Sequence, residues 1–312
     1  MRVSLQDRGQ LQPPADGAWL YTVTPGVHGG LVAVWVVSEE RNPRVVFHRP
    51  AGCDAVAATY QTCEPDLVVP IYGLRLSFPE AQILPAQAEF LPDEILLVGT
   101  RCQYAKDGPE LNAEVRSLDG KRLRRGCFGD GISHVRATPN GDVWVGYFDE
   151  GVFGNCGWGD ADAPAPLGRA GVVRWSSQDF MKLYEAGPEA DICDVYAATL
   201  FGEDLWTSTY VDFPLSHFTA TSQRIIPTAD SGVQALITDG ATVVTVGEYS
   251  KPGTFRVWDT ASTARGPRAT GRIALPKYNS KRDVLRVMGH ADQLHAFLGG
   301  RWYTAPLADF LP

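Results

Sequence analysis

Pairs of short apolar segments, each pair joined by a polar turn, recur along this chain. Five pairs close on a small residue, and they run from Ala86 to Gly99, Val135 to Gly146, Val195 to Ser208, Val233 to Gly247 and Leu285 to Gly299. The closing residues are separated by 47, 62, 39 and 52 positions, a mean of 50. That spacing is typical of a repeat built from four β-strands.

The turns inside these pairs indicate hairpins. Asn140-Gly141 and Asp239-Gly240 are dipeptides that readily adopt the positive φ of tight hairpin turns. The runs that follow them, Val143–Val145 and Val243–Val246, are too short and too rich in β-branched residues for helices. Each pair is therefore predicted to be the inner hairpin of one repeat.

Two more strands are predicted after each hairpin. Candidates for the third strand are Asn112–Leu118, Gly171–Trp175 and Thr254–Trp258, and candidates for the edge strand are Arg122–Phe128, Gln223–Ile226 and Gly271–Leu275. Tryptophans inside the strands (Trp19, Trp35, Trp144, Trp175, Trp206 and Trp258) are expected to pack between neighbouring sheets.

The two ends of the chain predict a ring. Ala18–Thr24 and Leu31–Val37 supply a further hairpin, with a third strand at Arg44–His48 and a fourth within Leu67–Phe78, where residues 50–80 also hold an insertion. The last unit has only Arg301–Leu307 after its hairpin, so it lacks one strand. Arg2–Gln6 is the candidate that completes it, because pairing of the two ends removes an exposed sheet edge.

These hairpins resemble β-propeller repeats of the broad WD40, NHL and YVTN kind. Thr138–Gly146 (TPNGDVWVG) is similar to an NHL repeat, and Phe255–Asp259 ends in the Trp-Asp dipeptide of WD40 strands. The resemblance implies an all-β fold, with residues 1–312 as a single β-propeller domain. Six four-stranded blades are the favoured count, and five or seven remain open. No family supplies catalytic residues that match this chain position by position.

Composition narrows the classes of function. The net charge of −8 and the pI of about 5.3 argue against binding of nucleic acid, which depends on a basic surface. The N-terminal residues lack an apolar signal segment, and no stretch of about 20 apolar residues exists, so we expect a cytoplasmic monomer that does not contact membranes. The six cysteines, at positions 53, 63, 102, 127, 156 and 193, have no C-x-x-C pair and are predicted to be reduced thiols.

One long connection stands out among the loops expected on one face of the ring. Tyr147–Arg169 has 23 residues, with several acids, aromatics and glycines. Two interpretations are open: a lid or ligand-binding loop, or an insertion that packs over the top of the blades. Asp160-Ala161-Asp162 resembles the start of a calcium loop, but the remaining ligands do not follow.

Candidate site residues lie in these loops. The acids Asp130, Asp149, Asp191, Asp194, Asp212, Glu248 and Asp283 are expected to face one another around the central channel, although each could equally cap a turn. His134 and His217 are the histidines expected on this face. The catalytic candidates are His134, Asp149 and Asp194. The ligand-binding candidates are Phe148, Asp149, Glu150, Trp158, Tyr210, Asp212, Glu248, Tyr249, Asp283 and Trp302.

Two classes of function fit this pattern. The first is a binding propeller whose acidic, aromatic loops recognise a protein segment or a small molecule. The alternative is a metal-assisted lyase or hydrolase that uses the loop carboxylates and His134, with either no cofactor or a divalent cation. The sequence does not name the ligand, because a fold does not fix a function.

Overall fold

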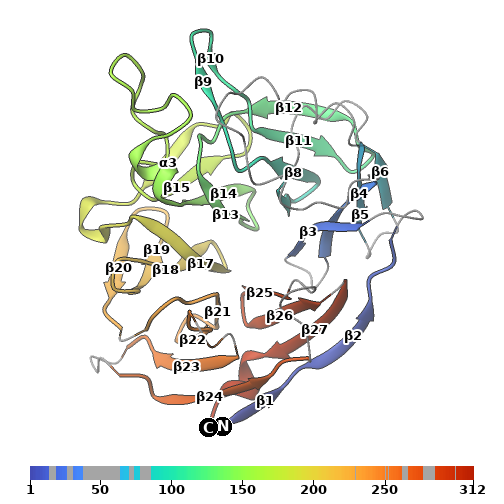
Figure 1. The fold of residues 1–312 in the computed structure, drawn as a ribbon, viewed down its shortest axis with the longest axis vertical. Coiled ribbons are helices and arrows are strands. Elements are labelled where there is room, and N and C mark those ends of the chain that lie inside the picture. The colour runs from blue at the N-terminus through green and yellow to red at the C-terminus, as the bar shows by residue number, and fades with distance from the viewer. Residues whose placement is uncertain are drawn as a thin grey trace.

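Four-stranded antiparallel sheets stand around a central axis in the computed structural model (Figure 1). The structure describes residues 1–13, 19–26, 31–37, 64–69, 74–77, 86–228, 230–249, 251, 253–261, 266–276, 285–298 and 300–312. Within these residues the strands form six sheets of four or five strands and one two-stranded ribbon. The chain is thus a single all-β propeller, as the repeat predicts.

The sheets follow one another along the chain. The first contains β3 (Trp19–Pro25), β4 (Leu31–Val37), β5 (Glu64–Val69) and β6 (Leu74–Ser77). The second contains β7 (Gln87–Phe90), β8 (Glu94–Val98), β11 (Ala113–Ser117) and β12 (Arg122–Gly126), with the ribbon β9 (Tyr104–Ala105) and β10 (Gly108–Pro109) between β8 and β11. The third contains β13 (Ile132–Ala137), β14 (Asp142–Tyr147), β15 (Val172–Ser176) and β16 (Lys182–Glu185).

The remaining sheets complete the circle. The fourth contains β17 (Asp194–Phe201), β18 (Asp204–Tyr210), β19 (Leu215–Phe218) and β20 (Gln223–Ile226). The fifth contains β21 (Ala235–Thr238), β22 (Thr242–Val246), β23 (Thr254–Asp259) and β24 (Ala269–Ala274), and the sixth contains β25 (Leu285–His290), β26 (Gln293–Leu298) and β27 (Arg301–Pro306). Three short helices are described: α3 (Asp149–Phe153), η1 (Pro188–Ala190) and η2 (Leu307–Phe310).

The predicted hairpins are confirmed. Strand β13 pairs with β14, and β21 pairs with β22, each across its predicted turn. Gly141 and Gly240 have φ values of 92° and 90°, the left-handed conformation that a side chain would disfavour. Side chains of Asn140 and Asp239 accept hydrogen bonds from backbone N–H groups two residues onward, which fixes both turns.

The first sheet differs from the prediction in its outer strands. Strand β4 pairs with β5 (Glu64–Val69), and β5 pairs with β6 (Leu74–Ser77). The segment predicted as one fourth strand therefore contains part of the third strand and the whole of the fourth. The predicted third strand, Arg44–His48, lies outside the described residues.

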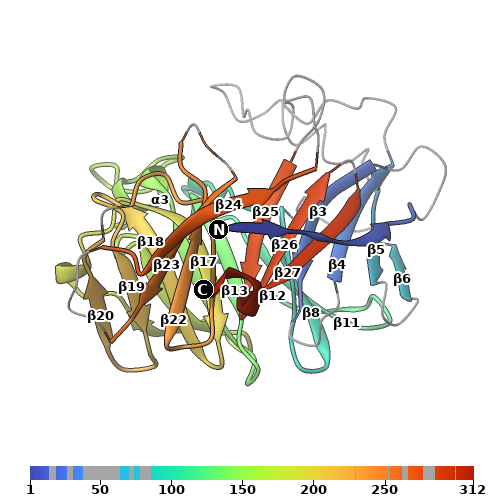
Figure 2. The ribbon, with the colours of Figure 1, turned by 90° about the horizontal axis from the view of Figure 1, so that it is seen from below.

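The N-terminal segment joins two neighbouring sheets. Strand β2 (Gln6–Gln10) pairs antiparallel with β27, so the two ends of the chain do meet in one sheet. Arg2–Gln6 was the wrong segment, because β1 (Arg2–Ser4) instead pairs parallel with β24. The reason is Val3, which is 2% exposed and lies in a core cluster with Ile273 and Phe310. The labelled termini lie close together in both views (Figures 1 and 2).

Tryptophans pack between the sheets, as predicted, wherever their side chains are described. Trp144, Trp175, Trp206 and Trp258 are at most 4% exposed. The indole N–H of Trp144 donates to the Glu203 carbonyl at 3.0 Å, and that of Trp258 donates to Thr245 Oγ1 at 3.0 Å. The rings of Trp144 and Trp258 therefore contribute buried apolar area while their polar groups keep a partner.

Candidate functional site

A cavity of about 480 Å³ occupies the centre of the ring. Its walls come from the inner strands of all six sheets, for example Val23 of β3, Gln87 of β7 and Ile132 of β13. Ala198, Ala235 and Val287 continue the wall on β17, β21 and β25. The inner strand of each sheet is therefore the one predicted from its small, apolar residues.

The charge of this cavity differs from the prediction. Its described lining contains Arg101, Arg136 and Arg286 and no aspartate or glutamate. None of the six described acids expected around the channel lines the cavity, and two of them are held by arginines. Asp130 forms an ion pair with Arg101 at 2.9 Å, and Glu248 forms one with Arg256.

His134 is the one catalytic candidate that lines the cavity. Burial lowers its pKa to about 3, the charge of Arg136 adds to this effect, and backbone hydrogen bonds at Val195 and Tyr196 oppose it. The imidazole is thus neutral near pH 7 and is a weak base. These contacts suit a wall residue that joins β13 to β17.

His217 is not on the loop face. It lies in β19, where its ring stacks on Trp206 with centroids 4.3 Å apart and its Nε2 lies 3.0 Å from Asp204 Oδ2. The prediction for this histidine was wrong, because a strand position with an aromatic neighbour and a carboxylate partner satisfies the ring within its own sheet.

Asp149 and Asp194, the other catalytic candidates, are close enough to interact. Asp149 begins α3 and is exposed, and Asp194 begins β17. Burial raises the pKa of Asp194 to about 6, and the charge of Asp149 adds to the rise. The structure thus brings these two predicted carboxylates together from neighbouring sheets, and neither of them lines the cavity.

Replacing Asp194 is expected to stabilise the protein at neutral pH. Since the pKa in the folded state lies above the ordinary value of 3.8, ionisation of Asp194 opposes folding as the pH rises from about 4 to about 6. The full difference corresponds to about 3 kcal/mol, and solvent screening at this half-exposed carboxyl reduces it to about 1 kcal/mol. Asp194→Asn should raise the melting temperature at pH 7 by about 2 °C and have little effect at pH 4.

Asp212→Asn, a change of an exposed aspartate near the same face, is the matched control for this measurement. A melting-temperature difference between Asp194→Asn and the unaltered protein that stays constant from pH 4 to pH 7 would contradict the assignment.

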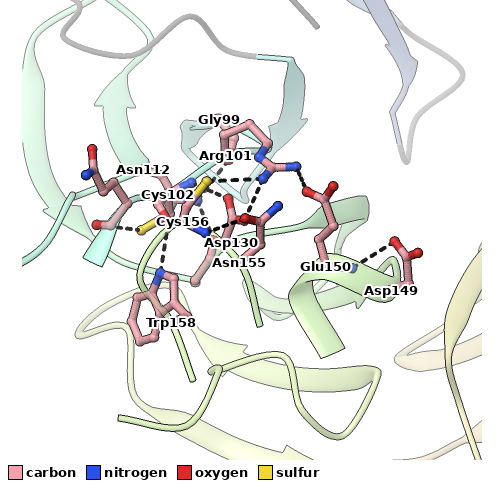
Figure 3. A network of polar contacts seen from close by, with 12 residues as sticks. Gly99, Arg101, Cys102, Asn112, Asp130, Asp149, Glu150, Asn155, Cys156 and Trp158 are labelled. Atoms are coloured by element: carbon pink, nitrogen blue, oxygen red, sulfur yellow. Dashed lines mark hydrogen bonds and ion pairs between the residues drawn. The ribbon is translucent and has the colours of Figure 1, made fainter. Parts of the chain in front are cut away.

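Arg101, one of the residues that line the cavity, organises a polar network (Figure 3). Its guanidinium contacts Asp130 and Glu150 and lies 5.5 Å from the centroid of the Phe148 ring. Nη2 also donates to Cys156 Sγ at 3.2 Å. Glu150 and Phe148, two predicted ligand-binding residues, are thus brought together by an arginine that the sequence analysis did not select.

Trp158 anchors the long connection instead of facing solvent. It is 3% exposed, its indole N–H donates to the Cys102 carbonyl at 2.8 Å, and its ring contacts Tyr104 with centroids 5.0 Å apart. Figure 3 shows this residue beneath the Arg101 network. The geometry of Tyr147–Arg169 agrees with an insertion that packs over the blades, and Trp158 has no free surface for a ligand.

Trp302 also differs from its prediction. It lies in β27, where it stacks on His295 and Phe297 with ring planes 7° and 9° apart. Its indole N–H donates to His295 Nδ1 at 3.1 Å. This tryptophan therefore belongs to the packing between sheets, like the others. Asp283 lies outside the described residues.

Four aromatic rings of the fourth and fifth sheets contact one another, and we call them the aromatic surface: Tyr196 on β17, Tyr210 at the end of β18, Phe213 in the loop after β18 and Tyr249 in the loop after β22. Phe213 is 6% exposed and forms the base, whereas Tyr210 and Tyr249 are 44% and 63% exposed. The ring of Tyr249 meets those of Tyr196 and Phe213 edge to face, with centroids 6.0 and 5.7 Å apart.

Acids border the aromatic surface. Asp212 is exposed between Tyr210 and Phe213, and the charge of Asp194 contributes to the raised pKa of Tyr196. The hydrogen bond with Tyr249, 3.3 Å between the two hydroxyl oxygens, is the largest cause and raises the pKa of Tyr196 to about 12. Glu248 precedes Tyr249 and is held by Arg256 and Lys251.

Sequence reasoning missed Tyr196 and Phe213, which complete this surface. Tyr196 lies on the inner strand β17, where a register shift between Val195 and Ala197 interrupts the alternation, so strand periodicity gave no signal for it. Phe213 has a positive φ of 49° in the loop after β18, a conformation that no sequence pattern announces.

The described residues contain no group of three or more His, Cys, Asp or Glu side chains that could hold a metal ion. Four cysteines are described, Cys102, Cys127, Cys156 and Cys193, and all four are free thiols. No helix among the described residues has the length and apolar character to cross a membrane.

Comparison with known proteins identifies the fold. No protein-family model matches the chain, and no curated protein matches it. Hsv2 of Kluyveromyces lactis is similar in structure, with a TM-score of 0.50 and 10% identity over 90% of this chain and 70% of that one.

Two further solved structures are similar. The calcium-binding protein regucalcin of Agrobacterium tumefaciens has a TM-score of 0.49 and 10% identity, over 97% of this chain and 94% of that one. The Cps50 (Swd1) β-propeller domain of Myceliophteria thermophila has a TM-score of 0.49 and 9% identity, over 96% and 98%. The ring of antiparallel sheets itself defines the fold class of this protein as β-propeller.

Proposed function

We propose that the protein is a binding propeller and that its aromatic surface takes up a protein segment that carries lysine or arginine. The domain comprises residues 1–312, and the six sheets support a count of six blades. The observation that carries the proposal is the pair of exposed tyrosines, Tyr210 and Tyr249, held by a buried aromatic base.

The chemistry of the surface supports a cationic ligand. An ammonium or guanidinium group is attracted to the face of an aromatic ring by about 0.5–2 kcal/mol, depending on its exposure to water. Asp212 at the edge adds a carboxylate to which such a group can donate hydrogen bonds. The overall charge of −8 favours approach of a basic partner over an acidic one.

The energetics also suit a binding surface. The exposed rings of Tyr210 and Tyr249 contribute little to the stability of the folded protein. They offer a ligand rigid contact area at a low cost in conformational entropy. Tyrosine is enriched among the residues that dominate binding energy. The buried ring of Phe213 holds both in place.

Selection of random peptides on the immobilised protein tests the proposal. Lysine and arginine should be enriched in the selected peptides, and Tyr249→Ala should weaken binding of the best peptide at least about tenfold. Phe153→Ala is the matched control, because Phe153 is 67% exposed on a connection of another sheet and should leave binding unchanged. Enrichment of acidic or purely apolar peptides, or equal loss in both variants, would contradict the proposal.

A further inference from the structure

We propose that Cys102 and Cys127 form a modification site, where a hydroperoxide oxidises the two thiols to a disulfide that an added dithiol reduces again. The pair belongs to the second sheet, whereas the aromatic surface belongs to the fourth and fifth, so the site does not depend on the proposed function. Three features of the structure support it: the contact between the two sulfur atoms, the hydrogen bonds that hold the surrounding backbone, and the different exposure of the two thiols.

The two sulfur atoms are in contact. Cys102 follows β8 and Cys127 follows β12, and their Sγ atoms lie 3.5 Å apart although 25 positions separate the residues in the chain. A disulfide bond is about 2.0 Å long, so the sulfur atoms need to approach by about 1.5 Å. Among the four described cysteines, no other two sulfur atoms lie within hydrogen-bond distance of each other. This pair is therefore the one that oxidation can join directly.

Buried polar side chains hold the backbone at both cysteines. The N–H of Cys102 donates to Asp130 Oδ1 at 2.7 Å (Figure 3). Beside Cys127, the N–H of Phe128 donates to Asn112 Oδ1 at 3.0 Å. The two acceptor residues, Asp130 and Asn112, are 3% and 2% exposed. Because a disulfide forms only between cysteines in a narrow range of positions, a backbone fixed in this way favours one specific pair.

Cys127 is expected to react first. It is partly exposed, whereas Cys102 is buried. The hydrogen bond from the Cys102 thiol lowers the pKa of Cys127, burial opposes this effect, and the N–H of Gly129, 3.3 Å from Cys127 Sγ, adds to it. The same contact between the thiols, together with burial, raises the pKa of Cys102. Since the thiolate is the nucleophile, Cys127 attacks the oxidant and Cys102 acts as the second thiol.

The oxidation takes two steps when the hydroperoxide is hydrogen peroxide. The Cys127 thiolate attacks one oxygen atom, so a sulfur–oxygen bond forms, the oxygen–oxygen bond breaks, and hydroxide leaves and takes up a proton as water. Cys102 Sγ then attacks the sulfur of this sulfenic acid, so the sulfur–sulfur bond forms and the sulfur–oxygen bond breaks. The hydroxyl group leaves with the Cys102 proton as a second water. Two electrons thus pass from the two thiols to the peroxide.

Peptide mapping of the folded full chain tests the site. The protein is treated with a small molar excess of hydrogen peroxide, its remaining thiols are blocked with iodoacetamide, and it is digested with trypsin without reduction. Trypsin cleaves after lysine and arginine, so the two cysteines fall on separate peptides, Cys102–Lys106 and Gly126–Arg136. We expect mass spectrometry to find these two peptides joined in most chains, with the loss of two free thiols per chain. Dithiothreitol should restore both thiols.

Three variants assign the roles of the thiols. In Cys102→Ser the joined peptides should be absent, and dimedone should label the sulfenic acid on Cys127. In Cys127→Ser, Cys102 should stay reduced. Cys193→Ser is the matched control, because Cys193 is partly exposed and precedes β17 in another sheet, and it should form the disulfide as the unaltered protein does.

The unaltered protein alone can overturn the proposal, so a variant that fails to fold does not remove the test. Cys156 is the competing thiol, since Arg101 Nη2 donates to its Sγ at 3.2 Å. A disulfide that joins Cys156 to either member of the pair would overturn the assignment. Oxidation of Cys156 or Cys193 while Cys102 and Cys127 both remain open to iodoacetamide would also overturn it.

Discussion

A protein that lacks residues 1–10 is expected to melt about 5 °C lower and to associate at its exposed sheet edges. The deletion removes β1 from β24 and β2 from β27, and it takes Val3 out of a core cluster. Burial of a valine is worth about 2 kcal/mol, and each net backbone hydrogen bond about 1 kcal/mol. Ordering the two strands costs conformational entropy, which offsets part of these gains. We therefore expect the deletion to lower the free energy of unfolding by about 3 kcal/mol.

Calorimetry and light scattering after size-exclusion chromatography measure these two effects. Deletion of residues 1–5 removes only β1 and should lower the melting temperature without exposing the edge of β27. Asp7→Asn alters the exposed ion pair with Arg301 and serves as the control, with no measurable change expected. A fully truncated protein that melts as before and scatters light as the unaltered protein does would refute the role of these strands in closing the ring.

The second large effect is expected at the buried pair of Glu89 and Arg136. Arg136→Met removes the partner of a carboxyl that is 3% exposed, and breaking a buried ion pair typically costs about 3–5 kcal/mol. The cost should be largest near pH 8, where Glu89 would be ionised. It should shrink toward pH 5, because Glu89 can then take up a proton.

The direction of this pH dependence follows from the pKa of Glu89. The folded-state value of about 7 lies above the ordinary 4.5, so ionisation of this carboxyl opposes folding as the pH rises through that interval. Without Arg136 the opposition grows, since the neighbouring positive charge that favours ionisation is gone.

Chemical denaturation at pH 5 and pH 8 measures how much free energy of unfolding Arg136→Met loses at each pH. Glu89→Gln/Arg136→Met is the matched variant, and it should recover much of the stability at pH 8 and depend little on pH. If the single and double variants lose the same stability at both pH values, the two side chains are not coupled as the geometry indicates.

The hairpins could be predicted from the sequence because their determinants are local. Asn140-Gly141 and Asp239-Gly240 fix their turns through short-range hydrogen bonds. The short β-branched runs after them form β14 and β22. Edge strand Gln223–Ile226 was predicted to the residue, since polar turn residues precede it and a proline follows.

The pairing of segments that are far apart in the sequence could not be predicted from local patterns. Val3 and Gln6 belong to the same apolar-polar segment, yet they pair with different sheets because the core around Phe310 takes up Val3. Trp158 looked like a loop aromatic, and only the Cys102 carbonyl, 56 positions away, shows that it is an anchor.

The residues of the candidate site were likewise predictable only where the signal is local in the sequence. Tyr210, Asp212 and Tyr249 were selected because they stand in loops after predicted strands, and Tyr210 and Tyr249 do lie in the aromatic surface. The arginines that line the central cavity were not predicted. Arg136 alternates with His134 on β13, and an arginine on an inner strand was the available signal.

The position of β2 has a consequence for synthesis of the chain. During translation β2 emerges before its partner β27, which follows every other strand of the ring along the chain. Until then, β2 lacks its partner strand, and Val3 can pair with β24 but lacks the contribution of Phe310 to its core cluster. Pairing of β2 with β27 must therefore follow synthesis of all the other strands of the ring, and the edge of β2 stays unpaired until then.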